Sequence, residues 1–281
     1  MTDRVCRFLF EDLDIRGVLV QLEGAWTAMQ HERGYPPPVK TLLGEMAAVA
    51  ALISSDLKTP GRLSFQLQGD GAVSLLVVDC DEQLRLRGMA RYTASDAPLA
   101  ELLGKGRLQL SLQSGKAAQT YLSTVPLEGE SVAEIFEHYL VQSEQQPARL
   151  WLSANDGQAS GLFLQALPGA ADKDSDGWNR VQFLASTLRP EELSLPAETL
   201  LTRLFPEETI RLFAPRTVSY HCPRDEDKVR GMLISLGREE VEGILAEHGA
   251  IVVKDDICNQ EYRYGADIIE ELFPSAGKIL H

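Results

Sequence analysis

Residues 62–78 read RLSFQLQGDGAVSLLVV, and this stretch decides the fold class. Its first seven residues alternate polar and apolar side chains, which is the period of a strand with one buried face. Gly69-Asp70-Gly71 then supplies a tight turn before the largely apolar residues 73–78. The stretch therefore predicts a β-hairpin.

The same pattern recurs on both sides of this hairpin. Residues 83–89 and 107–113 alternate in a similar way, and the turn Asn155-Asp156-Gly157 separates two more strand-like segments, residues 149–153 and 161–167. Because short turns join most of these strands, we expect a mainly antiparallel sheet.

Helical patterns interrupt the strands. Residues 38–57 are rich in Ala, Leu and Met and follow a run of prolines. Residues 131–146 begin with Ser131, have Glu134 three positions later as a capping box, and end before Pro147. Residues 1–168 are therefore predicted to form an N-terminal α+β core.

A linker of short helices is predicted for residues 169–216, where the composition turns small, polar and acidic and the strand period stops. Its clearest helix carries Trp178, Val181, Leu184 and Leu188 on one face, a set that we call the linker stripe. Prolines separate this helix from its neighbours. Such short helices are marginal by themselves, so we expect them to pack on another surface.

A small C-terminal α+β domain is predicted for residues 217–281. Residues 229–236 and 241–245 have apolar side chains at helical spacing, and residues 250–253 and 261–264 are strand-like. These segments are enough for a separate compact domain.

Composition excludes several classes of protein. The 281-residue chain has 27 Lys and Arg against 41 Asp and Glu, a net charge of −14, and it lacks a basic patch, so we expect no nucleic-acid partner. The apolar run at residues 5–10 is broken by Arg7 and differs from a secretory signal. No helical apolar stretch approaches the ~20 residues that cross a bilayer. We therefore expect a cytoplasmic protein without a membrane partner.

Enzyme signatures are missing from the sequence. Gly104-Lys105-Gly106 lacks the third glycine of a dinucleotide loop, and His31-Glu32 lacks the second His of a zinc protease. Residues 172–177, DKDSDG, match the first half of a calcium loop, but Phe183 stands where that loop needs a bidentate Glu. We therefore expect a protein that is not an enzyme, with an acidic turn at residues 172–177.

Two of the four cysteines, Cys222 and Cys258, lie in turn-like contexts near the C-terminus. Two thiolates cannot by themselves close a structural zinc site, which takes four ligands. His221 and Asp255 could complete such a site, so a zinc-binding regulatory module stays open as an alternative function. The other two cysteines lie in strand-like apolar surroundings, where buried and inert thiols are the rule.

Several short motifs occur together in a specific order. They are LQGDG at residues 67–71, RG at 87–88, PLEGE at 126–130, Tyr139 with SEQQP at 143–147, and EEV at 239–241 with IL at 244–245. In these motifs the chain resembles the 33 kDa chaperonin family, the redox-regulated heat-shock holdases of bacteria, over nearly its whole length.

The resemblance implies an ATP-independent holdase that binds unfolded client proteins. In that family an α+β core is followed by a linker and a small zinc domain, and monomer exchanges with homodimer. Four cysteines, as Cys-x-Cys and a later Cys-x-x-Cys, hold zinc in the reduced, inactive form. Oxidation releases zinc, joins each neighbouring pair as a disulfide, and unfolds the zinc domain and linker.

This chain departs from the family at the switch. By the resemblance, Cys222 and Cys258 fall on the first and fourth cysteine positions, whereas Arg224 and Asp255 replace the second and third. The zinc and the two short-range disulfides therefore do not carry over, and we expect no cofactor. Because the replaced positions share one metal in relatives, we expect Arg224 and Asp255 to form an ion pair.

The sequence leaves open whether Cys222 and Cys258 join. As ligands of one ion in relatives, their sulfurs would lie roughly 3.8 Å apart, so a small loop shift would allow a disulfide. Such a bond would staple the C-terminal domain shut on oxidation. The alternative is that both thiols stay reduced in the cytosol.

The sequence as a whole predicts a holdase chaperone that acts under oxidative or heat stress. We expect its clients to bind apolar surface on the core sheet and the linker stripe, because locally unstable elements open and expose hydrophobic side chains. A thiol-disulfide oxidoreductase that uses Cys222 or Cys258 is the alternative from another class, although the chain lacks Cys-x-x-Cys.

Overall fold

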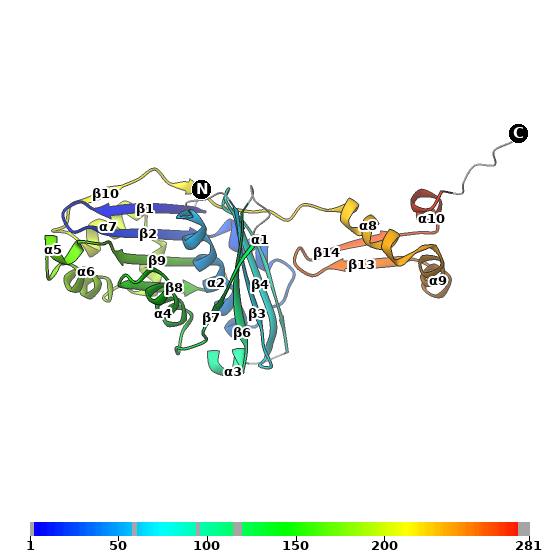
Figure 1. Cartoon of the computed structure of the whole chain (residues 1–281), viewed down its shortest axis with the longest axis horizontal. Coiled ribbons are helices and arrows are strands. Elements are labelled where there is room, and N and C mark those ends of the chain that lie inside the picture. The colour runs from blue at the N-terminus through cyan, green and yellow to red at the C-terminus, as the bar shows by residue number, and fades with distance from the viewer. Residues whose placement is uncertain (1–2, 58–60, 94–95, 115–119, 275–281) are drawn as a thin grey trace, which may run out of the picture. The chain divides into compact units, whose positions relative to one another are not determined.

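The computed structural model describes residues 3–57, 61–93, 96–114 and 120–274. The chain divides into two compact units, Met1–His221 and Cys222–His281 (Figure 1). The first unit contains both the predicted core and the predicted linker. Helices occur together with mainly antiparallel sheets, so the predicted α+β class is confirmed.

Sheet A, the first of two six-stranded sheets, contains the N-terminal strands. Its hydrogen-bonded order is β10 (Ile210–Leu212), β1 (Arg4–Phe10), β2 (Ile15–Leu22), β9 (Ala159–Ala166) and β8 (Ala148–Ala154), and β11 (Arg216–Thr217) also pairs with β1. All of these pairs are antiparallel. The hairpin predicted around residues 155–157 is β8–β9, in which Ala154 pairs with Ala159.

Sheet B contains the stretch from which the fold class was predicted. Its order is β12 (Ser219–Tyr220), β5 (Arg85–Tyr92), β4 (Val73–Asp81), β3 (Gly61–Gln68), β6 (Arg107–Ser114) and β7 (Thr120–Val125). The predicted hairpin is β3–β4, with Gln68 opposite Leu75. Leu63, Phe65 and Leu67 are buried, as their alternation predicts. The β12–β5 pair is parallel, whereas the other pairs of sheet B are antiparallel.

Helices of the first unit fill the space between the sheets and cover sheet A. They are α1 (Gly24–Gln30), α2 (Pro37–Ser55), α3 (Leu99–Leu103), α4 (Val132–Glu144), α5 (Ala170–Lys173), α6 (Gly177–Ala185), the 3₁₀ helix η1 (Pro190–Ser194) and α7 (Ala197–Leu204). The predicted N-cap of α4 is confirmed, because the Ser131 hydroxyl accepts a hydrogen bond from the Glu134 N–H at 3.2 Å.

Helix α2 is the central helix of the first unit and contacts strands of both sheets (Figure 1). Two prolines open it, at positions where a missing N–H costs no hydrogen bond. By length and composition alone, α2 is the one helix in the described part of the chain that is long and apolar enough to cross a membrane. However, 72% of that apolar window is buried inside the fold, as in a core helix.

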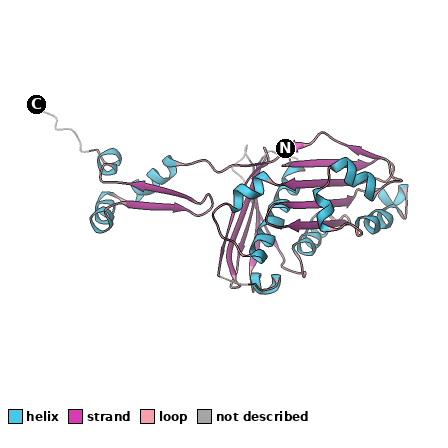
Figure 2. Cartoon of the chain, turned by 180° about the vertical axis from the view of Figure 1, so that it is seen from behind, coloured by secondary structure: helices cyan, strands magenta, loops and turns pink. Residues whose placement is uncertain are grey.

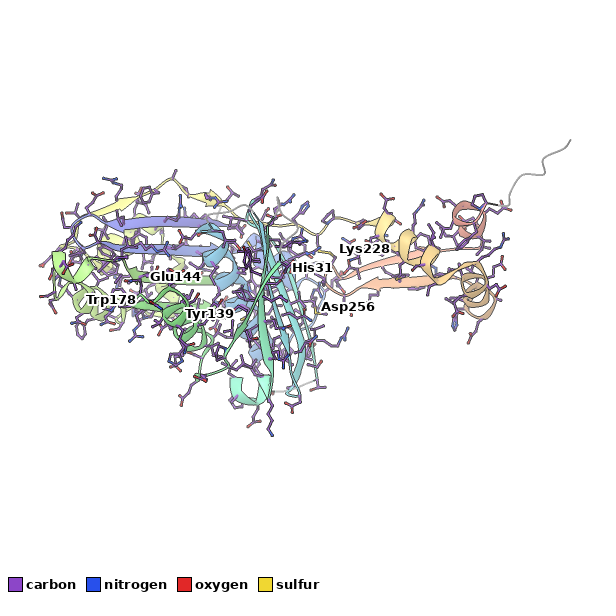
Figure 3. The ribbon with its side chains drawn as sticks, viewed as in Figure 1. His31, Tyr139, Glu144, Trp178, Lys228 and Asp256 are labelled. Carbon is purple, nitrogen blue, oxygen red and sulfur yellow. A yellow bond between two sulfur atoms is a disulfide. The ribbon has the colours of Figure 1, made fainter. Side chains whose placement is uncertain are left out.

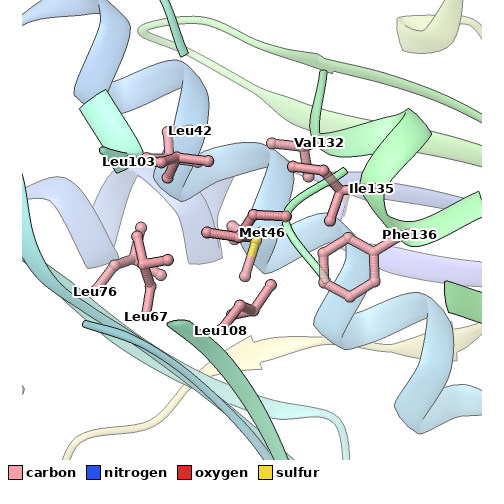
Figure 4. A pocket seen from close by; sticks show the side chains of 10 residues that line it. Leu42, Met46, Leu67, Leu76, Leu103, Leu108, Val132, Ile135 and Phe136 are labelled. Carbon is pink, nitrogen blue, oxygen red and sulfur yellow. The ribbon is translucent and has the colours of Figure 1, made fainter. Parts of the chain in front are cut away.

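The main core surrounds α2 and contains buried side chains of both sheets. Figure 4 shows the part of it where α2 and α4 face sheet B. Phe65 of β3 and Phe136 of α4 pack edge to face, with ring centroids 5.0 Å apart. Only apolar side chains line the small cavity beside them, which has a volume of about 10 Å³. Burial of each leucine or phenylalanine contributes about 1.5–3 kcal/mol to the stability of the fold. This close-packed region therefore stabilises the unit on which the linker packs.

The second unit contains α8 (Glu226–Leu236), α9 (Arg238–His248), β13 (Ile251–Asp255), β14 (Gln260–Tyr264) and α10 (Ile268–Leu272). The predicted strands pair as an antiparallel hairpin. Five buried residues form its core: Leu233, Val241, Ile251, Ile268 and Ile269. So small a core contributes little stability, and other links must help to hold the unit together.

Candidate functional site

The linker covers an apolar face of sheet A (Figure 2). This contact, which we call the linker seam, is built from two sets of buried side chains. The sheet set is Cys6, Phe8, Phe10, Leu13, Ile15, Leu19, Leu162 and Leu164, and the linker set is Val181, Ala185, Leu193, Ala197, Leu200, Leu201, Leu204 and Phe205. The seam therefore hides a broad hydrophobic surface beneath short helices.

Phenylalanine rings pack within the linker seam and on the sheet beneath it. Phe10 and Phe205 meet edge to face across it, with ring centroids 5.0 Å apart. The Phe8 ring lies against Gly17 of the neighbouring strand, where an added Cβ would overlap it. A glycine at this position therefore allows the ring to lie flat on the sheet.

The linker stripe faces this seam. Val181 is fully buried, and Trp178, Leu184 and Leu188 are partly buried against the seam. Figure 3 marks Trp178 on α6. Phe183, on the same helix, points the other way and is 71% exposed. The amphipathic pattern thus packs on sheet A, which meets the expectation that the linker needs another surface.

A buried glutamine also fixes the linker to sheet A. The Gln21 Nε2 donates hydrogen bonds to the carbonyl oxygens of Leu193 at 2.6 Å and Leu195 at 2.7 Å. Arg4 Nε in turn donates to Gln21 Oε1 at 3.0 Å. Sequence reasoning missed Gln21, although one signal was available: it is a lone amide in the otherwise apolar end of strand β2.

Ion pairs link the linker helices at the solvent edge. Arg180 lies 2.8 Å from Glu208 and 2.9 Å from Asp174. Hydrogen bonding to Arg180 lowers the pKa of Asp174, and hydrogen bonding to Arg189 lowers the pKa of Glu192. Exposed pairs of this kind contribute ~0–1 kcal/mol each, so they orient the linker more than they hold it closed.

A disulfide joins Cys222 to Cys258 within the second unit. Their Cα atoms lie 5.5 Å apart, across a sequence separation of 36 residues. Cys222 is half-buried in the segment that leads into α8, whereas Cys258 is 8% exposed in the turn between β13 and β14. The bond therefore ties the start of the unit to the tip of its hairpin.

The predicted ion pair between Arg224 and Asp255 is wrong. Among the described residues, Arg224 pairs with Glu226 at 3.3 Å, and its guanidinium lies 4.4 Å from the centroid of the Tyr262 ring. The Asp255 carboxylate instead accepts a hydrogen bond from the Cys258 N–H at 3.2 Å. Arg224 and Asp255 therefore each contact other neighbours and not one another.

The donor atoms around the disulfide do not suit zinc. The two sulfurs bond to each other, and Arg224 brings a permanent positive charge where a thiolate would be needed. In the described part of the chain, no three His, Cys, Asp or Glu side chains come together in a group that could hold a metal.

The two remaining cysteines lie in the first unit and are buried free thiols. Burial raises the pKa of Cys80 to about 12, and burial also raises the pKa of Cys6. Because the thiolate is the reactive form, both side chains are poor nucleophiles. Neither of these two thiols is therefore suited to thiol–disulfide exchange.

Comparisons with known proteins agree over nearly the whole chain. A family model described as "Hsp33 protein" matches residues 3–265. The 33 kDa chaperonin of Pseudomonas aeruginosa (strain UCBPP-PA14) is 41% identical over 286 residues, covering 98% of this chain and 96% of that protein. The 33 kDa chaperonin of Nitrosococcus oceani is 42% identical over 275 residues, covering 96% and 94%.

A crystal structure of the 33 kDa chaperonin (heat shock protein 33 homolog) from Thermotoga maritima has the same fold. It matches with a TM-score of 0.81 and covers 96% of this chain and 97% of that chain, at 21% sequence identity. At this identity the likeness concerns the fold.

Proposed function

Because the chain belongs to the Hsp33 family of chaperones, we propose that it is an ATP-independent holdase that binds unfolded proteins and prevents their aggregation under oxidative or heat stress. It acts by binding and is not an enzyme. The observation that carries the proposal is the linker seam, where short helices cover a continuous hydrophobic face of sheet A.

The seam has the properties of a surface that can be uncovered. Helices α6 and α7 have nine and eight residues, which is too short for stability outside a tertiary contact. In the ion pairs at their edge the arginines are exposed, although the shared Glu192 is buried. Elements with few buried contacts open more readily than the core beneath them. Displacing the linker would expose both Phe8 of the sheet and the linker stripe to a client.

Net charge and family membership indicate where the protein acts and which partners it binds. A net charge of −14 disfavours nucleic acid as a partner. We propose a cytoplasmic protein whose partners are unfolded clients and a second copy of itself, and that carries out this role without nucleic acid, membrane or bound zinc.

The experiment measures light scattering of a chemically unfolded test protein, diluted with or without the chaperone and without ATP. Val181→Asp places a charge in the seam and is expected to release the linker and increase suppression of aggregation. Asn179→Asp is the matched control, because residue 179 is exposed on the same helix. Failure of both the wild type and Val181→Asp to suppress aggregation would contradict the holdase proposal.

A further inference from the structure

Several contacts of the second unit lie beside the disulfide, where the segment before α8 meets strand β14. The Gln260 Nε2 donates to the Cys222 carbonyl oxygen at 2.7 Å, and the Asp225 N–H donates to the Tyr262 hydroxyl at 2.8 Å. Arg224 stacks on the same Tyr262 ring. Together these contacts join the start of α8 to strand β14.

The disulfide is the strongest of these links. Tyr262 is buried, but its partners Arg224 and Asp225 are exposed, and the hydrophobic cluster of the unit is small, with five buried side chains. A covalent bond across a sequence separation of 36 residues removes many conformations from the unfolded chain. The folded state of this unit therefore depends on the bond.

We propose that the Cys222–Cys258 disulfide is a reducible staple of the second unit, and that its reduction by a dithiol, not its oxidation, opens this unit and increases client binding. The staple stands on the structure of the second unit, and the statement about clients rests on the proposed holdase function. This direction is opposite to the one that the family resemblance implies for relatives with four cysteines. It restricts the proposed stress role to heat, because an oxidant keeps the second unit closed.

The geometry indicates which sulfur reacts first. A thiolate of the dithiol attacks Sγ of the half-buried Cys222, because Cys258 is only 8% exposed. The bond between the two cysteines breaks, Cys258 leaves as a thiolate and takes up a proton, and a mixed disulfide forms at Cys222. The second thiolate of the dithiol then releases Cys222 as a thiol. Two electrons pass to the protein, and the dithiol becomes a disulfide.

Opening would expose hydrophobic side chains that are now buried. Leu233, Val241 and Ile251 form the centre of the small core, and Ile234 and Val252 beside them are already 51% exposed. Once α8 separates from the hairpin, these groups form a continuous apolar surface. Surfaces of this kind bind exposed apolar segments of unfolded chains.

The test uses full-length protein that is oxidised with peroxide and then incubated with or without dithiothreitol. Mass spectrometry of a non-reduced digest is expected to find the Cys222–Cys258 cross-link in the oxidised sample. Amide hydrogen exchange at Val241 and Ile251 is expected to become at least about 100-fold faster on reduction, while exchange at Phe65 in the first unit stays unchanged.

Two variants make the result specific. Cys222→Ser should show fast exchange in the second unit with and without dithiothreitol, whereas Cys80→Ala, whose site lies in the first unit, should respond as the wild type does. If Cys222→Ser fails to fold, reduced wild-type protein that has been alkylated provides the same comparison. Absence of the cross-link, or equal exchange in the oxidised and reduced wild type, overturns the staple.

Aggregation suppression by the same samples tests the direction of regulation. Dithiothreitol is expected to increase suppression several-fold, and peroxide to reduce it again. Activation by peroxide and inhibition by dithiothreitol would overturn the proposed direction. If exchange responds to reduction but neither form suppresses aggregation, the staple stands and the holdase function is refuted.

Discussion

At the scale of single residues, Gln21 shows how one polar side chain controls a hydrophobic contact. Its amide donates hydrogen bonds to the backbone carbonyl oxygens of Leu193 in η1 and of Leu195 just after it. If residue 21 were apolar, the carbonyl oxygens of Leu193 and Leu195 would lose the hydrogen bonds that Gln21 donates. A buried acceptor without a partner costs about 1–3 kcal/mol, so Gln21 adds to the hydrophobic contacts that keep the linker docked.

The substitution Gln21→Leu should therefore loosen the linker without harming sheet A. We expect amide exchange in α7 to become about tenfold faster or more, with greater suppression of aggregation. Gln165→Leu is the matched control, because Gln165 is equally buried but bonds to Arg16 and Glu144, away from the linker. Equal exchange in α7 for the two variants would show that Gln21 does not hold the linker.

Arg224 contributes to the second unit through its contact with the Tyr262 ring. Its position over Tyr262 gives a cation–π contact of about 0.5–1 kcal/mol at an exposed site. Arg224→Ala should make amide exchange in β14 a few-fold faster, and Arg224→Lys should restore part of the protection. Arg263→Ala, at an exposed position of the same strand, is the control and should leave the exchange near that of the wild type.

At the scale of elements, α2 carries a partly buried titratable group beside the core. Glu45 lies on this helix, and among the described residues no hydrogen bond or ion pair engages its carboxylate. Burial raises the pKa of Glu45 to about 7. Because the folded pKa exceeds the unfolded value of about 4.3, the ionised side chain costs stability above pH 7, and this cost disappears as the pH falls towards 4.

Replacing Glu45 by Gln should therefore stabilise the first unit mainly at alkaline pH. We expect a gain on the order of 1–3 kcal/mol at pH 8 that shrinks towards zero between pH 7 and pH 4. Thermal unfolding at several pH values measures it, with Glu101→Gln on the surface of α3 as the control. A gain that is the same at pH 4 and pH 8 would show that ionisation of Glu45 is not its cause.

At the scale of the whole molecule, the chain keeps the fold of its family but has only two of the four cysteines that the resemblance leads us to expect at the switch. Positions 224 and 255 hold Arg and Asp, and both side chains are engaged in contacts within the second unit. The two remaining cysteines are half of the ligands that a structural zinc site takes. The second unit is held by its small core together with the disulfide and the contacts beside it.

This arrangement predicts that reduced full-length protein carries no stoichiometric zinc. Metal analysis after incubation with zinc and gel filtration should find well under one equivalent per chain. The double substitution Arg224→Cys with Asp255→Cys should restore four thiolates and raise the content to about one equivalent. One equivalent of zinc in the reduced wild type would contradict the prediction.

The sequence by itself determined the elements whose signals lie within a few neighbouring residues. The β3–β4 and β8–β9 hairpins followed from alternation on both sides of a tight turn, and the start of α4 followed from Ser131 and Glu134. By contrast, β10, β11 and β12 have two or three residues each, too few to show a period. They are strands because β1 or β5 offers them a hydrogen-bonded edge.

Only the tertiary structure decided which surfaces and side chains meet. The linker stripe was evident from its helical spacing, but the sheet that it covers was not. Gln21 reaches a carbonyl 174 residues away, the two cysteines join across 36, and Arg224 stacks on Tyr262 instead of pairing with Asp255. Local patterns fix backbone conformation, because that depends on neighbouring residues; the partner of a side chain depends on how distant segments pack.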